Sequence, residues 1–195
     1  MDEWTLSESE VVAATRWLRI EKNAYLRDGA EVRDYYVLRR PAFVVVIAAD
    51  DADRVIAMRQ YRPATGEFYL AFPAGYIAPG EDPERAAIRE LREETGALGR
   101  NWRHVGLLDP LPGYIDSRAH IFCCDVVRLD REARVREDGA AEHDPVTMLE
   151  RSAVREAIVG GQITEMQAVS AFLLAEAVTA AYPAHERGVK DEAPQ

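Results

Sequence analysis

The chain contains 195 residues, 48% of them hydrophobic, and carries a formal net charge of −10 at pH 7. This length predicts one domain with at most a small accessory piece, and the hydrophobic fraction is sufficient for a folded core. The acidic balance argues against a nucleic-acid partner, because nucleic-acid-binding surfaces are usually basic. A small phosphorylated substrate is compatible with this charge, since bound metal ions reverse the local electric field.

The sequence carries no signal for export or membrane insertion. Residues 1–5 are acidic and polar, unlike a signal peptide. The longest apolar run, residues 42–49, is far shorter than the roughly 18 residues of a membrane-spanning helix. The adjacent Cys123 and Cys124 do not suggest a disulfide framework and are interpreted as small apolar residues of a strand. We therefore expect a cytoplasmic protein with no membrane partner.

The N-terminal third has the pattern of β-structure. Residues 16–20 alternate between polar and apolar side chains, and residues 35–38 supply a partner strand beyond a turn at Asp28-Gly29. Residues 42–49 are typical of a buried strand, and residues 54–60 follow as its hairpin partner.

The first clear helix follows Asp82, a good N-cap, with Pro83 at the first helical position and Gly96 as its C-terminal stop. Further strands are expected at residues 105–108 and 120–127, a charged loop at 130–145, and a last helix from about residue 164 to 182. Strands mixed with two packed helices predict an α/β sandwich.

Three carboxylates lie on one face of the first helix. Glu90, Glu93 and Glu94 stand at positions i, i+3 and i+4, which share a face in an α-helix. Such like charges repel one another unless a cation joins them, and Mg²⁺ prefers carboxylate oxygens. Arg89 is placed to pair with Glu93 or Glu81. The alternative interpretation is a solvated charged face.

The spacing around this helix resembles the signature of the Nudix hydrolase superfamily. That signature is Gly, five residues, Glu, seven residues, Arg-Glu-aliphatic, one residue, Glu-Glu, one residue, Gly, aliphatic. It is filled here by Gly75, Glu81, Arg89, Glu90, Leu91, Glu93, Glu94, Gly96 and Ala97, of which only Ala97 is smaller than the family's usual residue.

The resemblance implies an α/β/α sandwich with a mixed sheet and a site for Mg²⁺ or Mn²⁺. Glu90 and Glu94 would be the main metal ligands, with Glu93 and the carbonyl of Ala74 beside them, and Arg89 would support catalysis with Glu93. The metals would neutralise the substrate's phosphate oxygens and activate a water molecule.

Flanking segments resemble the ADP-ribose pyrophosphatase branch of this superfamily: residues 59–64, 72–75, 112–113 and 160–164. That branch implies a small antiparallel β-domain at residues 1–40 that is exchanged in a homodimer, a catalytic domain at 41–183 and a flexible tail at 184–195. The implied reaction is cleavage of ADP-ribose to AMP and ribose 5-phosphate. The implied substrate contacts are Arg62, Arg33, Pro112 and Gly113.

The resemblance also places the general base on a mobile loop after the sheet. Glu142 is the first candidate and His143 the second, while Asp144 could help to hold a metal.

Departures from the branch pattern occur at Ala71, Tyr114, Ile115 and Ser117, where the terminal sugar would be recognised. The alternatives are therefore another nucleotide sugar, a nucleoside triphosphate, or a non-catalytic Nudix-fold ligand sensor.

Overall fold

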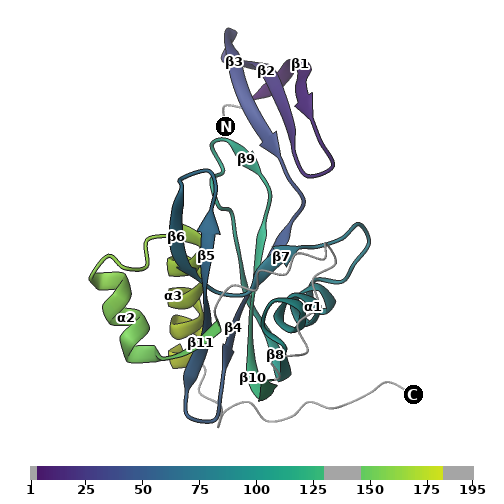
Figure 1. Ribbon diagram of the computed structural model, residues 1–195. Helices are drawn as coiled ribbons and strands as arrows, with labels where there is room; N and C mark the ends of the chain where they lie inside the picture. The colour runs from purple at the N-terminus through teal and green to yellow at the C-terminus, as the bar shows by residue number, and fades with distance from the viewer. Residues whose placement is uncertain (1–3, 130–145, 182–195) are drawn as a thin grey trace.

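The structure is a computed structural model that describes residues 4–129 and 146–181 (Figure 1). The described residues form a four-stranded sheet at the N-terminal end of the molecule and a seven-stranded central sheet flanked by helices. Among the described residues, no helix combines the length and the apolar composition that crossing a membrane requires.

The N-terminal sheet has the strand order β1-β2-β3-β9. Its first three strands are antiparallel neighbours, whereas β9 runs parallel to β3. The strands are β1 (Thr5–Ala14), β2 (Arg19–Arg27), β3 (Ala30–Arg39) and β9 (Ile115–Asp116). The β2–β3 turn contains Asp28 at φ 51° and Gly29 at φ 77°, the left-handed region that Asp and Gly tolerate best. The predicted Asp28-Gly29 turn is thus confirmed, but the strand at β1 was not foreseen.

The central sheet has the order β11-β5-β4-β10-β8, with β6 paired to β5 and β7 paired to β4. It is mixed, because β10 runs parallel to β4 while the other pairs are antiparallel. Its strands are β4 (Phe43–Ala49), β5 (Arg54–Arg62), β6 (Glu67–Ala71), β7 (Ala74–Tyr76), β8 (Ala97–Leu108), β10 (Ala119–Leu129) and β11 (Val146–Glu150).

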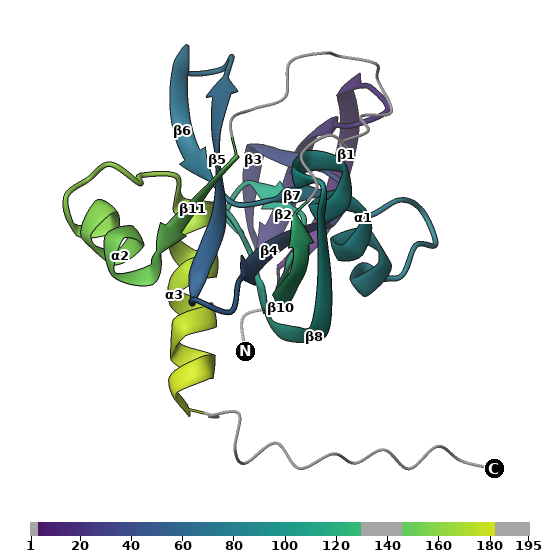
Figure 2. The same cartoon turned by 60° about the horizontal axis from the view of Figure 1, so that its bottom comes forward.

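Helices cover both faces of this sheet (Figure 2). α1 (Pro83–Thr95) lies on one face, and α2 (Arg151–Val159) and α3 (Met166–Ala181) lie on the other. Alternate residues of β4 divide between two cores: Val44 and Val46 pack with Leu91 of α1, whereas Val45 and Ile47 pack on the α2–α3 side. The predicted α/β/α sandwich is therefore confirmed.

The capping residues of α1 behave as predicted. The Asp82 carboxylate accepts hydrogen bonds from the backbone N–H groups of Glu84 and Arg85, and Pro83 occupies the first turn. At the other end Gly96 adopts φ 72°, and its N–H donates to the carbonyl of Arg92. These caps fix where the acidic face of the helix begins and ends.

Candidate active site

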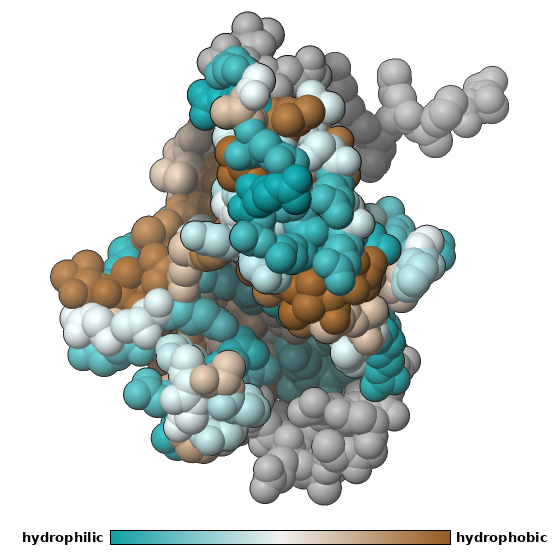
Figure 3. All heavy atoms as spheres, turned by 90° about the horizontal axis from the view of Figure 1, so that it is seen from above, coloured by the Kyte–Doolittle hydropathy of each residue, from teal (hydrophilic) through white to brown (hydrophobic). Residues whose placement is uncertain are grey.

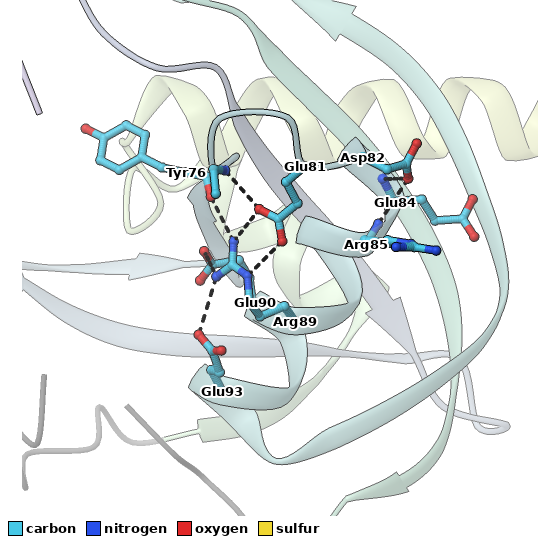
Figure 4. A network of polar contacts seen from close by, with 9 residues as sticks. Tyr76, Glu81, Asp82, Glu84, Arg85, Arg89, Glu90 and Glu93 are labelled. Atoms are coloured by element: carbon cyan, nitrogen blue, oxygen red, sulfur yellow. Dashed lines mark hydrogen bonds and ion pairs between the residues drawn. The ribbon is translucent and has the colours of Figure 1, made fainter. Parts of the chain in front are cut away.

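The acidic face of α1 lies against the backbone of β7 and the loop that follows it (Figure 4). The Glu90 side chain is only 12% exposed. A Cβ atom built on Gly75 would lie 2.0 Å from the Glu90 carboxyl carbon, so any other residue there would displace this carboxylate from its position. The glycine that opens the signature thus has a steric role at the first of its helical glutamates.

Arg89 is the centre of a polar network that joins α1 to the preceding loop (Figure 4). Its guanidinium donates to both oxygens of Glu81 at 2.9 and 3.0 Å, and to the carbonyl of Tyr76 at 2.9 Å. It also donates to Glu90 at 2.7 Å and to Glu93 at 3.4 Å. The predicted pairings of Arg89 with Glu81 and Glu93 are both present.

Burial and pairing act differently on the carboxylates of this network. The hydrogen bonds between Arg89 and Glu81 lower the pKa of Glu81. They are also the largest cause of the raised pKa of Arg89. Burial raises the pKa of Glu90, because desolvation there outweighs the opposing hydrogen bond from Arg89. Glu90 is thus a desolvated carboxylate whose charge Arg89 compensates only in part.

Glu94 faces the same strand. One of its carboxylate oxygens accepts a hydrogen bond of 2.9 Å from the backbone N–H of Ala74. The structure therefore brings Ala74, Glu90, Glu93 and Glu94 to one region, the junction between α1 and β7.

This junction offers the donor chemistry that a hard divalent cation needs, namely carboxylate and carbonyl oxygens. The desolvated Glu90 carboxylate, which lies against Gly75, fits such a cation. Within residues 4–129 and 146–181, however, no three Asp, Glu, His or Cys side chains already converge as a metal site. The side-chain positions explain this, because Glu90 and Glu93 turn toward Arg89 while Glu94 binds the backbone of Ala74.

The two arginines predicted to contact substrate lie outside this junction, and both form ion pairs with carboxylates. Arg62, at the end of β5, pairs with Glu165 at 2.8 Å. The Nε of Arg62 and the second oxygen of Glu165 are buried and have no hydrogen-bond partner among the described residues. Arg33, on β3, is exposed and pairs with Glu31 and Glu8.

Pro112 and Gly113 line a hollow of about 620 Å³ between the N-terminal sheet and the segment before β10. The Tyr35 hydroxyl donates to the carbonyl of Gly113 at 2.5 Å. The hollow has aromatic, acidic and basic walls: Trp4, Tyr25, Tyr35, Val37, Arg39, Asp109, Pro112, Gly113, Tyr114, Ile115, Asp116, Ser117 and Arg118.

Tyr76 connects the N-terminal sheet to the signature helix, a role that the sequence analysis missed. Trp17 stacks on its ring at 5.6 Å between centroids, and the guanidinium of Arg40 lies 5.2 Å from the same ring. Its carbonyl accepts the hydrogen bond from Arg89. The available signal was its position directly after Gly75, inside the signature.

The three residues considered for the general base and its metal neighbour, Glu142, His143 and Asp144, lie outside the described residues. Their roles stay predictions.

Comparisons with known proteins agree with this geometry. A sequence model of the NUDIX domain matches residues 38–154. An ADP-ribose pyrophosphatase of Mycobacterium tuberculosis is 31% identical over 143 residues, covering 71% of this chain and 67% of that protein. A CMP-5'-(N-acetyl-N-hydroxy-3-aminopropyl)phosphonate hydrolase of Streptomyces rubellomurinus is 30% identical over 122 residues, covering 63% of this chain. The match spans 59% of the Streptomyces protein, less than two thirds of its length.

Among solved structures, an ADP compounds hydrolase superposes with a TM-score of 0.79 at 25% sequence identity. The match covers 93% of this chain and 96% of that one, so it includes the N-terminal sheet as well as the central sandwich.

Proposed function

Because this chain belongs to the Nudix family and is a Nudix hydrolase, we propose that it cleaves the diphosphate bond of a nucleoside-diphosphate-linked sugar in a Mg²⁺- or Mn²⁺-dependent reaction. ADP-ribose is the first candidate substrate, and AMP and ribose 5-phosphate are its products. The observation that carries the proposal is the half-buried Glu90 carboxylate against Gly75, within a complete set of signature glutamates. The ADP-ribose pyrophosphatase of Mycobacterium tuberculosis among its relatives supports the choice of substrate.

We propose that Glu90, Glu93, Glu94 and the carbonyl of Ala74 hold the metal. When bound, a divalent cation there supplies charge neutralisation for the diphosphate oxygens and lowers the pKa of a water molecule. Arg89 keeps Glu90 and Glu93 in place while its own charge is satisfied by Glu81.

In the reaction, the oxygen of water bonds to one phosphorus, and the bond from that phosphorus to the bridging oxygen breaks. A nucleoside monophosphate and a sugar phosphate leave. We assign the proton of the attacking water to Glu142, since a carboxylate on a loop serves as a general base when it comes within hydrogen-bond reach.

For the substrate's organic parts we propose the hollow lined by Pro112 and Gly113, with Arg62 and Arg33 as contacts for its anionic groups. Each arginine is already paired with a carboxylate and is therefore less available to bind substrate. The proposed substrate site thus depends more on the hollow than on the two arginines.

We also propose a homodimer that exchanges the N-terminal sheet. All ten residues of β1 are exposed, and β1 lies at the end of its sheet, so its outer edge is open to a further strand. Figure 3 looks down on this part of the molecule and shows apolar and hydrophilic side chains mixed over its surface. Sedimentation of the full chain at several concentrations tests the dimer.

A wider substrate range is the second candidate. Ser117 is 9% exposed, and its hydroxyl donates to the carbonyl of Pro41 at 2.8 Å, whereas Tyr114 is 61% exposed. A hydroxyl already engaged with the backbone is less available to a sugar. The CMP-linked phosphonate hydrolase among the relatives supports acceptance of other nucleotide-linked compounds.

The test is release of phosphate-ester products from ADP-ribose, ADP-glucose, GDP-mannose, NADH, ATP and a CMP-linked phosphonate, each with Mg²⁺ and with EDTA. Metal-dependent cleavage centred on ADP-ribose supports the first candidate. Comparable rates across several diphosphates support the second, and cleavage of ATP alone contradicts both.

A further inference from the structure

Arg39, at the end of β3, joins the N-terminal sheet to the segment before β10. Its Nε donates to Glu21 of β2 at 2.6 Å, and its Nη1 contacts the carboxylate of Asp116 in β9. Glu21 is buried, with its side chain 7% exposed, and Arg19 approaches its other oxygen at 2.8 Å. A single guanidinium thus bridges a buried carboxylate on β2 and an exposed carboxylate on β9, the edge strand of the same sheet.

Backbone hydrogen bonds attach residues 113–118 both to β3 of the N-terminal sheet and to the first residue of β4 in the central sheet. The N–H of Leu38 donates to the carbonyl of Tyr114 at 2.7 Å, and the N–H of Phe43 donates to the carbonyl of Arg118 at 2.9 Å. The Tyr35 hydroxyl donates to Gly113. These bonds attach one wall of the hollow to β3 and to the start of β4.

The side chain of Arg39 adds to these backbone contacts by linking β9 to β2. β9 is only two residues long, so it has few ladder hydrogen bonds of its own to keep it in register. Hydrogen bonding to Arg39 is the main cause that holds the pKa of the Glu21 carboxyl below its usual value, so the anchoring end of the bridge stays ionised. Arg39 makes one charge-assisted hydrogen bond to each of two carboxylates, which ties β2 to β9 in a way that a lone surface pair does not.

We propose that Arg39 is a positioning residue for substrate selectivity: by bridging Glu21 and Asp116 it holds residues 113–118 as the wall of the hollow. The inference rests on the proposed function, because the hollow must receive part of the substrate for its wall to influence selectivity. Glu21 does not line the hollow, so it acts on substrate only through Arg39.

The experiment compares Arg39→Ala and Glu21→Gln with Arg19→Ala as the matched control. Arg19 also pairs with Glu21, but it is not among the residues that line the hollow. Each full-length variant is examined for amide hydrogen exchange and for kcat and KM on the best diphosphate substrate of the wild-type panel. Circular dichroism verifies that each variant is folded.

We expect amide exchange in residues 113–117 to be at least about tenfold faster in Arg39→Ala, because local opening no longer breaks the bridge. KM should rise about tenfold with kcat changed by less than about threefold, the pattern of lost ground-state binding. Glu21→Gln should change both readouts in the same direction by a smaller amount, and Arg19→Ala should leave them near wild type.

Unchanged exchange in Arg39→Ala refutes the positioning role, whether or not the enzyme is active. A raised KM in Arg39→Ala with a wild-type KM in Glu21→Gln means that Arg39 touches the substrate directly, and this also overturns the proposal. If the wild-type protein cleaves no diphosphate of the panel, the proposed function is refuted, and so is the role of Arg39 in substrate selectivity. The exchange measurement then still decides whether Arg39 holds the segment.

Discussion

Replacing Gly75 with alanine tests the steric relation between the signature glycine and Glu90. The new Cβ would lie 2.0 Å from the carboxyl carbon of Glu90 and 2.0 and 2.3 Å from its oxygens. Because favourable contacts begin near 3.5 Å, the carboxylate has to move by about 1.5 Å. Reactive groups displaced by about 1 Å can lose about 100-fold in rate, so we expect kcat to fall by about that factor.

The stability effect of Gly75→Ala should be comparable to its effect on rate, since about 100-fold in kcat corresponds to about 2.7 kcal/mol. Overpacking a filled site costs about 1–3 kcal/mol, and a chain of this size loses about 2–4 °C in Tm per kcal/mol. Gly29→Ala is the control: no described atom lies within 4 Å of its added Cβ, so it carries only the strain of φ 77°, about 1–2 kcal/mol.

The assay for both variants is metal-dependent product release at saturating substrate, with Tm from calorimetry. Gly29→Ala should lose stability and keep wild-type kcat, because its turn lies in the N-terminal sheet away from α1. A Gly75→Ala protein with wild-type kcat would refute the assignment of Glu90 to the metal site.

Three further predictions concern the same site and the core. Glu94→Gln keeps the shape of the side chain and removes its charge, so turnover should fall by at least about 100-fold with Tm nearly unchanged, as measured by the same assay and calorimetry. Arg89→Lys replaces a planar fork that contacts Glu81, Glu90 and the Tyr76 carbonyl with a single ammonium, and kcat should drop by about tenfold or more in a steady-state assay. Burial raises the pKa of Cys124 from 9.0 to about 12, so the neutral thiol stabilises the fold fully below pH 9, and this contribution is lost as the pH rises toward 12. Thiol titration should therefore show no reaction in the native protein at pH 8, and denaturant midpoints should decline above pH 9; rapid native labelling would contradict the buried position.

The sequence was informative wherever the determining interactions are local. The cap at Asp82, the stop at Gly96 and the carboxylate face of α1 depend on residues within a few positions of one another, and their periodicity determines their geometry. The pairing of Arg89 with Glu93 is of this kind, one helical turn apart.

The positions of the strands were less predictable from the sequence than that of the helix. β1 was missed because two register shifts interrupt its pairing with β2 and its residues are exposed on both faces, so it lacks the alternation that marks a half-buried strand. β8 begins at Ala97 rather than at residue 105, and Asn101 with φ 54° lies in its first half. An irregular long strand of this type resembles a loop when only composition is considered.

The parts of the candidate site that could not be predicted from the sequence are those formed by residues far apart in the chain. Arg62, a predicted phosphate contact, pairs with Glu165, 103 positions later in the chain. Arg39 and Asp116 are 77 positions apart, and Tyr35 and Gly113 are 78 apart. Pairings at such separations are decided by the fold, because any exposed arginine can meet any carboxylate that the topology brings near. The carboxylate face of α1 is therefore encoded in one short segment, whereas the walls of the proposed substrate hollow arise from packing between distant ones. Substitutions on these walls can change substrate preference while the hydrolytic residues stay intact.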